Sequence, residues 1–99
     1  MAEYFLTKKA VEDLSSIWQY TVHEWSEKQA DRYYTMLVKC FHEIADNPKI
    51  GKNYGEVTPE LFGLKVSRHI IYYRKLEDQS IEITRSLHGR MDLENRLKK

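Results

Sequence analysis

Hydrophobic residues in the first half of the chain recur every three to four positions, as on one face of an α-helix. One such stripe runs from Ala10 to Trp25, and another runs from Ala30 to Ala45. Because only the short stretch SEKQ and its flanks separate them, we expect the corresponding helices to form an antiparallel hairpin.

Polar residues mark the ends of these predicted helices. Thr7 is placed to cap the first helix, and Ser26 followed by Gln29 fits a capping box at the start of the next. Asn47-Pro48 ends that helix, because proline disfavours helical geometry in the residue before it.

Short alternating runs predict strands on both sides of the hairpin. Residues Ala2 to Leu6 form one candidate, and a loop from Pro48 to Glu60 precedes three more, Leu61–Ser67, Ile70–Leu76 and Ile81–Leu87. The order β-α-α-β-β-β predicts an α+β fold, with the helical hairpin packed on one face of a mainly antiparallel sheet. Asp92 is a plausible cap for a short C-terminal helix.

Alternation predicts which side chains of the last strand share a face: Ile81, Ile83, Arg85 and Leu87 on one side, and Glu82, Thr84, Ser86 and His88 on the other. If Leu76 opposes Ile81, then Arg74 opposes Ile83 and Tyr72 opposes Arg85. Arg74 and Arg85 then become diagonal neighbours, which repel unless an anion or a carboxylate lies between them.

For the strand before it, the turn around Arg68-His69 leaves two registers. A tight turn places Lys65 beside Tyr72. We prefer a looser turn, which gives a more apolar core face of Phe62, Leu64 and Val66 and leaves Lys65 on the other face with Tyr73 and His88.

Composition and charge narrow the class of protein. With 99 residues, 41% of them hydrophobic and 31% charged, the chain predicts a single folded domain over residues 1–99. Sixteen Lys and Arg residues against fifteen Asp and Glu residues disfavour a generic nucleic-acid coat, which needs a basic excess. Any basic site must therefore be local.

Cys40 is the single cysteine of the chain, so no internal disulfide is expected, and we interpret it as a packing residue in a reducing compartment. The segment MAEYFLTKK lacks the apolar run of a signal peptide, and no segment is long enough to span a membrane, so we expect a cytoplasmic protein. The spacing of His23, His42 and His69 predicts neither a zinc site nor another cofactor.

Cations accumulate toward the end of the sequence. Lys65, Arg68, Arg74, Arg85, His88 and Arg90 would form an anion-binding patch if the strands bring them together. The alternative is that the arginines extend to water or pair with acidic residues. His88 can act as a general acid or base, but it needs a partner within reach.

Aromatic residues give a separate signal on the hairpin, where Trp18, Tyr20, Trp25, Tyr33 and Tyr34 fall close together in the sequence. They either fill the core completely or leave an exposed aromatic groove for a partner segment. The sequence pattern leaves both interpretations open.

The element order, the loop NPKIGKNYGEV, the segment LKVSRHIIYYRKLEDQSIEITRSLHGRMDL and its LHGRMD ending resemble ParE-type toxins over essentially the whole chain. These toxins belong to the ParE/RelE superfamily of type II toxin–antitoxin systems. The resemblance implies one of two activities: RelE-type members cut messenger RNA on the ribosome, whereas ParE-type members are associated with poisoning of DNA gyrase. It also implies a ParD-like antitoxin that wraps the toxin.

Departures from the nuclease pattern favour the gyrase interpretation. Ile70 stands where the nucleases tend to carry arginine, Gly89 replaces a tyrosine that some pair with histidine, and no tyrosine follows Tyr73. RNA cleavage needs a base, a proton donor and cations. The sequence shows cations and one imidazole without an evident second proton-transfer partner, so we expect a non-enzymatic toxin.

We therefore expect the target to contact Lys65, Arg68, Arg74, Arg85, His88, Arg90, Met91 and Asp92. The antitoxin is expected to cover a hairpin groove around Trp18, Tyr20, Trp25 and Tyr34, to add a strand to the sheet edge, and to form a hetero-oligomer with the toxin. No membrane or sequence-specific nucleic-acid binding is expected. The alternatives are a RelE-type endoribonuclease using His88, Arg85 and Arg90, and a degenerate member that only binds its antitoxin.

Overall fold

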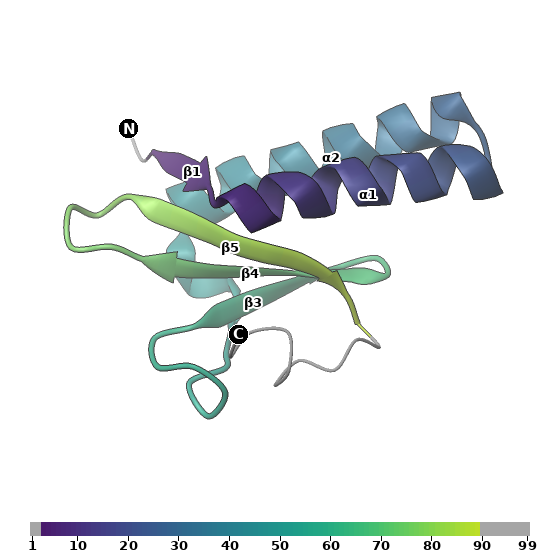
Figure 1. Cartoon of the computed structure of the whole chain (residues 1–99). Helices are drawn as coiled ribbons and strands as arrows, with labels where there is room; N and C mark the ends of the chain where they lie inside the picture. Colours follow the sequence, from purple (N-terminus) through teal and green to yellow (C-terminus); the bar gives the residue numbers. More distant parts are fainter. Residues whose placement is uncertain (1–2, 90–99) are drawn as a thin grey trace.

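The computed structural model describes residues 3–89, which form a helical hairpin lying on one face of a five-stranded sheet (Figure 1). The hairpin consists of α1 (Lys8–Glu24) and α2 (Glu27–Asp46). The strands are β1 (Tyr4–Leu6), β2 (Lys52–Asn53), β3 (Phe62–Val66), β4 (His69–Lys75) and β5 (Ile81–His88). This arrangement confirms the predicted α+β class.

The strand order across the sheet is β1-β5-β4-β3-β2, in which β1 runs parallel to β5 and the other neighbours are antiparallel. The predicted loop after α2 contains a 3-10 turn at Pro48–Ile50 and the short edge strand β2, both of which the sequence analysis missed. The expected C-terminal helix lies outside the described residues, as do Arg90, Met91 and Asp92. In residues 3–89, no helix has the length and apolar character needed to cross a membrane.

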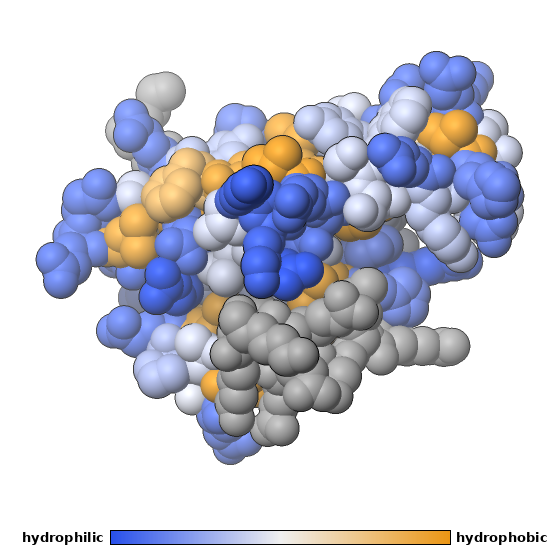
Figure 2. All heavy atoms as spheres, in the orientation of Figure 1, coloured by the Kyte–Doolittle hydropathy of each residue, from blue (hydrophilic) through white to orange (hydrophobic). Residues whose placement is uncertain are grey.

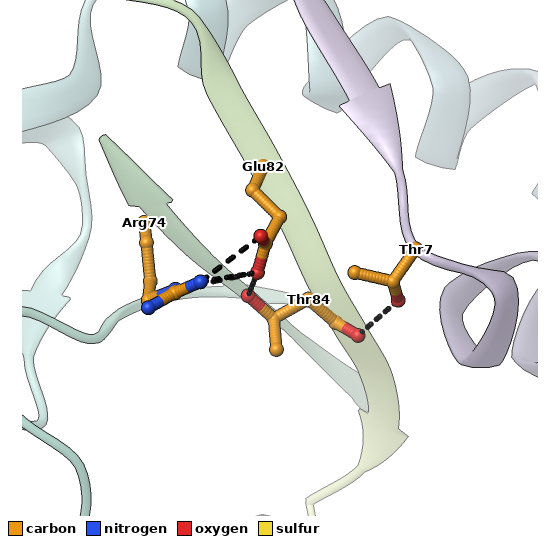
Figure 3. A network of polar contacts seen from close by, with 4 residues as sticks. All are labelled: Thr7, Arg74, Glu82 and Thr84. Carbon is orange, nitrogen blue, oxygen red and sulfur yellow. Dashed lines mark hydrogen bonds and ion pairs between the residues drawn. The ribbon is translucent and has the colours of Figure 1, made fainter. Parts of the chain in front are cut away.

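The predicted helix caps are confirmed. Thr7 Oγ1 accepts the Ala10 N–H at 3.0 Å, and Ser26 Oγ accepts the Gln29 N–H at 3.1 Å. Each hydroxyl satisfies a backbone donor that has no partner within its own helix. The Thr7 hydroxyl also donates to the Thr84 carbonyl at 2.8 Å, which ties the start of α1 to β5 (Figure 3).

The main core fills the space between the hairpin and the sheet. Its largest buried side chains come from α2, β4 and β5: Leu37, Phe41, Ile44, Ile71, Tyr73, Ile81 and Ile83. Cys40 packs against this core half-buried, which agrees with its interpretation as a packing residue. Burial also raises the pKa of its thiol, so the reactive thiolate is disfavoured.

The sheet face away from the hairpin carries a separate cluster of Leu61, Tyr72 and Leu87, with Ile70 and Tyr54 packed against it. The Tyr54 and Tyr72 rings meet edge to face, with centroids 5.3 Å apart. We call this group the open-face cluster. It shows that the segment after β2 folds back over the sheet.

The preferred loose turn between β3 and β4 is wrong. Val66 opposes His69, so the turn is the two residues Ser67-Arg68, and Ser67 adopts the positive φ of 55° that tight hairpin turns require. Lys65 therefore lies on the Tyr72 face, away from Tyr73 and His88. Phe62, Leu64 and Val66 still contact the main core, because Ile71 and Tyr73 carry the core face of β4.

A β-bulge also changes the register between β4 and β5. Tyr72 opposes Arg85 as predicted, but Tyr73 opposes Ile83 and Arg74 opposes Glu82, so Thr84 is an extra residue. The predicted pairs Arg74–Ile83 and Leu76–Ile81 are therefore wrong. The predicted common face of β5 is wrong as well, since Ile81 and Ile83 lie in the main core while Leu87 lies in the open-face cluster.

Candidate interaction surfaces

Arg74 is held by a carboxylate on the neighbouring strand. Its Nη2 donates to Glu82 Oε2 at 3.0 Å and its Nε to Glu82 Oε1 at 3.2 Å, while the Thr84 hydroxyl donates to the same Oε1 at 3.0 Å. Figure 3 shows these side chains converging beside β5. The Arg74 side chain remains 39% exposed while that of Glu82 is 14% exposed, so water reaches this ion pair from the arginine side.

Arg85 is held by Asp13 of α1. Arg85 Nε donates to Asp13 Oδ2 at 2.8 Å, and Nη2 donates to Oδ1 at 2.9 Å, so both carboxylate oxygens accept a hydrogen bond from the guanidinium. The Ser86 N–H donates to the same Oδ2 at 3.0 Å. The side chains are only 13% and 12% exposed, so this pair is nearly buried. The predicted side-by-side contact of Arg74 and Arg85 is therefore replaced by separate ion pairs.

Asp13 was not predicted from the sequence as a partner for a cation. A signal for it was present, because Asp13 follows Ala10 by three positions and precedes Ile17 by four, which places it on the sheet-facing stripe of α1. A carboxylate on an apolar stripe implies a buried partner. The sequence did not say which cation that partner would be.

Between the far end of the hairpin and the β3–β4 turn lies a groove of about 580 Å³, here called the turn groove. Its aromatic and basic lining comes from α1 and the residue after it, α2, the β3–β4 turn, the start of β4 and the end of β5: Tyr20, Trp25, Tyr33, Arg68, His69 and His88. The Arg68 guanidinium carbon lies 5.9 Å from the centroid of the Trp25 ring. Tyr20 and Trp25 are 60% and 62% exposed, so large aromatic surfaces face solvent here.

Two imidazoles meet in the turn groove. His69 and His88 are direct partners across β4 and β5, with ring centroids 5.6 Å apart, and Tyr33 Oη lies 2.6 Å from His69 Nδ1. His88 thus has a second histidine beside it, which the sequence analysis missed because 19 positions separate the two (88 − 69). Strand pairing alone brings them together.

The chemistry of this imidazole pair suits binding better than proton transfer. Burial, with smaller coulombic contributions from the neighbouring His88 and Arg68, lowers the pKa of His69 to about 4. A group with so low a pKa is a weak base at neutral pH. Within residues 3–89, no cluster of three or more His, Cys, Asp or Glu residues is arranged to hold a metal ion.

The remaining predicted aromatics line a different surface. Trp18 and Tyr34 border a groove of about 550 Å³ between β1, α1 and α2, here called the helix groove, together with Leu6 and Val11. Trp18 Nε1 donates to Asp31 Oδ1 at 3.0 Å, which links α1 to α2. Figure 2 shows apolar surface over β1 and the first turns of α1. The four aromatics expected around one groove are therefore divided between the turn groove and the helix groove.

The open-face cluster includes Ile70, one of the positions at which the sequence departs from the nuclease pattern. Ile70 packs there against the buried side chains of Leu61, Tyr72 and Leu87. Burial and the neighbouring Tyr54 raise the pKa of Tyr72 to about 12. A phenol with that pKa stays protonated at neutral pH and cannot act as a general base.

Comparison with known proteins gives consistent matches. A family model described as "ParE toxin of type II toxin-antitoxin system, parDE" matches residues 4–93. Toxin ParE1 of Mycobacterium tuberculosis is 32% identical over 97% of this chain and 98% of its own length. Toxin ParE of Escherichia coli is 31% identical over 98% of this chain and 94% of its own length.

Solved structures share the fold at lower sequence identity. A chain from the chromosomal ParDE toxin–antitoxin system of P. aeruginosa superposes with a TM-score of 0.76 at 19% identity, covering 89% of this chain and 96% of that one. A chain of the RelBE2 toxin–antitoxin complex of Mycobacterium tuberculosis gives a TM-score of 0.68 at 18% identity, covering 88% and 96%.

Proposed function

Because this chain belongs to the ParE toxin family of type II toxin–antitoxin systems, we propose that it inhibits DNA gyrase and that a ParD-like antitoxin holds it inactive. We place both proteins in the cytoplasm, where gyrase acts on DNA. The choice of gyrase follows from the family. The choice of binding over RNA cleavage is supported by the geometry described above.

The observation that carries this choice is the apolar character of the open-face cluster. RNA cleavage needs a base for the 2′-hydroxyl, an acid for the leaving oxygen and cations for the developing charge. On this face Ile70 packs among apolar side chains, and Tyr72 keeps its proton. His69, the imidazole beside His88, is a weak base. These properties favour a scaffold that binds its target.

The target-facing surface in this proposal is the end of the sheet where β5 finishes. Lys65 and Arg68 are exposed there, and His88 precedes Arg90, Met91 and Asp92 in the sequence. Arg85 lies three residues before His88 on β5, whereas Arg74 lies at the other end of β4, opposite Glu82. Their carboxylate partners give both arginines a structural role as well. The antitoxin would cover Trp18 and Tyr34 in the helix groove and Tyr20 and Trp25 in the turn groove.

A direct assay separates the proposal from the nuclease alternative. The free protein is added to gyrase with supercoiled DNA, and in parallel to translating ribosomes. We expect DNA cleavage complexes trapped on gyrase and no cuts in messenger RNA. Codon-positioned cuts without trapped gyrase would instead establish the endoribonuclease.

Two controls sharpen this assay. A His88→Ala variant that still arrests growth would weigh against the nuclease, because an enzyme that uses this imidazole should lose most of its activity. Expression of the wild-type protein alone should arrest growth. If it does not, the protein is a degenerate member that only binds its antitoxin.

A further inference from the structure

The turn groove combines an apolar wall with a positive edge. Tyr20, Trp25 and Tyr33 supply aromatic surface, and Arg68 lies at the Trp25 ring on the exposed turn. A groove of about 580 Å³ is in the size range of small-ligand pockets and has room for several side chains of a bound segment. Such a surface favours a ligand that pairs an apolar group with a negative one.

The distribution of charge around the groove also favours a ligand that carries a negative group. None of the described residues that line the groove carries a carboxylate, whereas Arg68 carries a permanent positive charge. Asp13, on the sheet-facing side of α1, is already engaged by Arg85 and by the Ser86 N–H. Burial is the main cause of the low pKa of His69, so His69 adds little positive charge at neutral pH and Arg68 is the fixed cation of the groove.

We propose that the turn groove binds a segment of the antitoxin in which an apolar side chain packs on Tyr20 and Trp25 while a carboxylate one or two residues away pairs with Arg68. That the segment belongs to the antitoxin rests on the proposed function. The kind of side chains expected in the segment is inferred from the lining of the groove. A guanidinium can lie against an aromatic face and still donate its in-plane N–H groups to a carboxylate. Arg68 is therefore positioned to make both contacts at once.

A peptide fits these observations better than a nucleic acid. Binding a phosphate backbone requires several cations along a continuous path. The turn groove offers one guanidinium, and the whole chain has a formal net charge of +1. Its mostly aromatic lining suits insertion of an apolar side chain, the usual anchor of a protein interface.

The proposal is tested by selecting random 12-residue peptides displayed on phage against the full-length free protein. The wild-type protein should enrich peptides in which an apolar residue lies within two positions of Asp or Glu. For a selected peptide, Arg68→Glu should weaken binding roughly tenfold or more, as expected for loss of a charge-assisted contact. A second selection on Arg68→Glu should enrich Lys or Arg in place of the acidic residue.

Lys75→Glu is the matched control, because Lys75 is exposed at the other end of β4. This substitution changes the net charge by the same amount as Arg68→Glu. It should keep the acidic motif and the wild-type affinity. Circular dichroism and a thermal melt verify that each variant is folded. The proposal would be overturned if Arg68→Glu selected the same acidic motif as the wild type, or if Lys75→Glu weakened peptide binding as much as Arg68→Glu does.

A further arm measures a fluorescent single-stranded RNA oligonucleotide, U12, binding to the same proteins. Tight RNA binding that Arg68→Glu abolishes, together with no enriched peptide motif, would assign the groove to nucleic acid instead. None of these measurements depends on gyrase. Failure of the gyrase assay with a clear acidic peptide motif would therefore reject the proposed target and keep the groove assignment.

Discussion

Asp13 and Arg85 lie 72 residues apart in the sequence and form a two-point ion pair that joins α1 to β5. The carboxylate also accepts the Ser86 N–H, so its oxygens satisfy three donors next to the β-bulge. The pair is nearly buried, with side chains 13% and 12% exposed. It fixes the hairpin against the sheet at the point where the strand register changes.

Asp13→Ala should lower the free energy of unfolding by about 3 kcal/mol, because it leaves the Arg85 guanidinium nearly buried without its counter-ion. Urea denaturation followed by circular dichroism measures this change. Asp46→Ala, at the exposed C-terminal end of α2, is the control and should be neutral or slightly stabilising. Equal stability of Asp13→Ala and the wild type would show that the pair contributes nothing.

Glu82→Ala should cost less than about 1 kcal/mol, although it removes a carboxylate that also contacts an arginine. The difference from Asp13 is solvent exposure, since Arg74 is 39% exposed and can be solvated when its partner is removed. The same urea titration compares both variants. A loss as large as that of Asp13→Ala would mean that the Glu82 network with Thr84 is more important than its exposure suggests.

Ser86→Ala should be neutral or slightly stabilising. Ser86 is 2% exposed, and its Oγ has no hydrogen-bond partner among the described residues. Replacing a buried unsatisfied hydroxyl with a methyl group removes a desolvation cost. Because the backbone N–H donates to Asp13, that contact is preserved in the variant. A destabilisation above about 1 kcal/mol would reveal a hydrogen bond of the hydroxyl in solution.

Gly51→Ala should destabilise the protein by about 2 kcal/mol, because an added Cβ would overlap the hydroxyl and ring of Tyr73. Tyr73 is fully buried, and its hydroxyl donates to the Pro48 carbonyl at 2.6 Å and accepts the Gly51 N–H at 2.9 Å. It therefore cannot move without breaking both contacts. Thermal unfolding compares this variant with Gly89→Ala, where a Cβ meets only the Arg68 carbonyl at 3.7 Å.

The stability of the protein should depend on His69 at acidic pH. Its pKa falls from the ordinary 6.5 to about 4 in the folded protein, mainly through burial. Between these values the unfolded chain binds the extra proton, so the free energy of unfolding should decrease as the pH falls from about 6.5 to about 4. Above pH 7, roughly, His69 should contribute no pH dependence.

Urea titrations across this pH range measure the effect, and an NMR titration of the His69 ring should have its midpoint near pH 4. His69→Gln should reduce the slope of stability against pH. Identical slopes in the wild type and His69→Gln would contradict the low pKa.

The family resemblance and the order of elements were accessible from the sequence because each depends on local patterns. The stripes from Ala10 to Trp25 and from Ala30 to Ala45 predicted α1 and α2, and Thr7 and Ser26 predicted their starts. A helix repeats within a few residues and a cap satisfies donors within one turn, so neighbouring residues carry that information.

The candidate surfaces depended on contacts that no local pattern contains. The bulge at Thr84 moved Leu87 away from the face of Ile83, and strand pairing placed His69 beside His88. Strand register is selected by packing between distant segments, and a shift of one residue reverses every side chain beyond it. The sequence by itself therefore determined the helices, most of the strands and the family. Only the tertiary structure decided which carboxylate holds Arg85 and how the exposed aromatics divide between the turn groove and the helix groove.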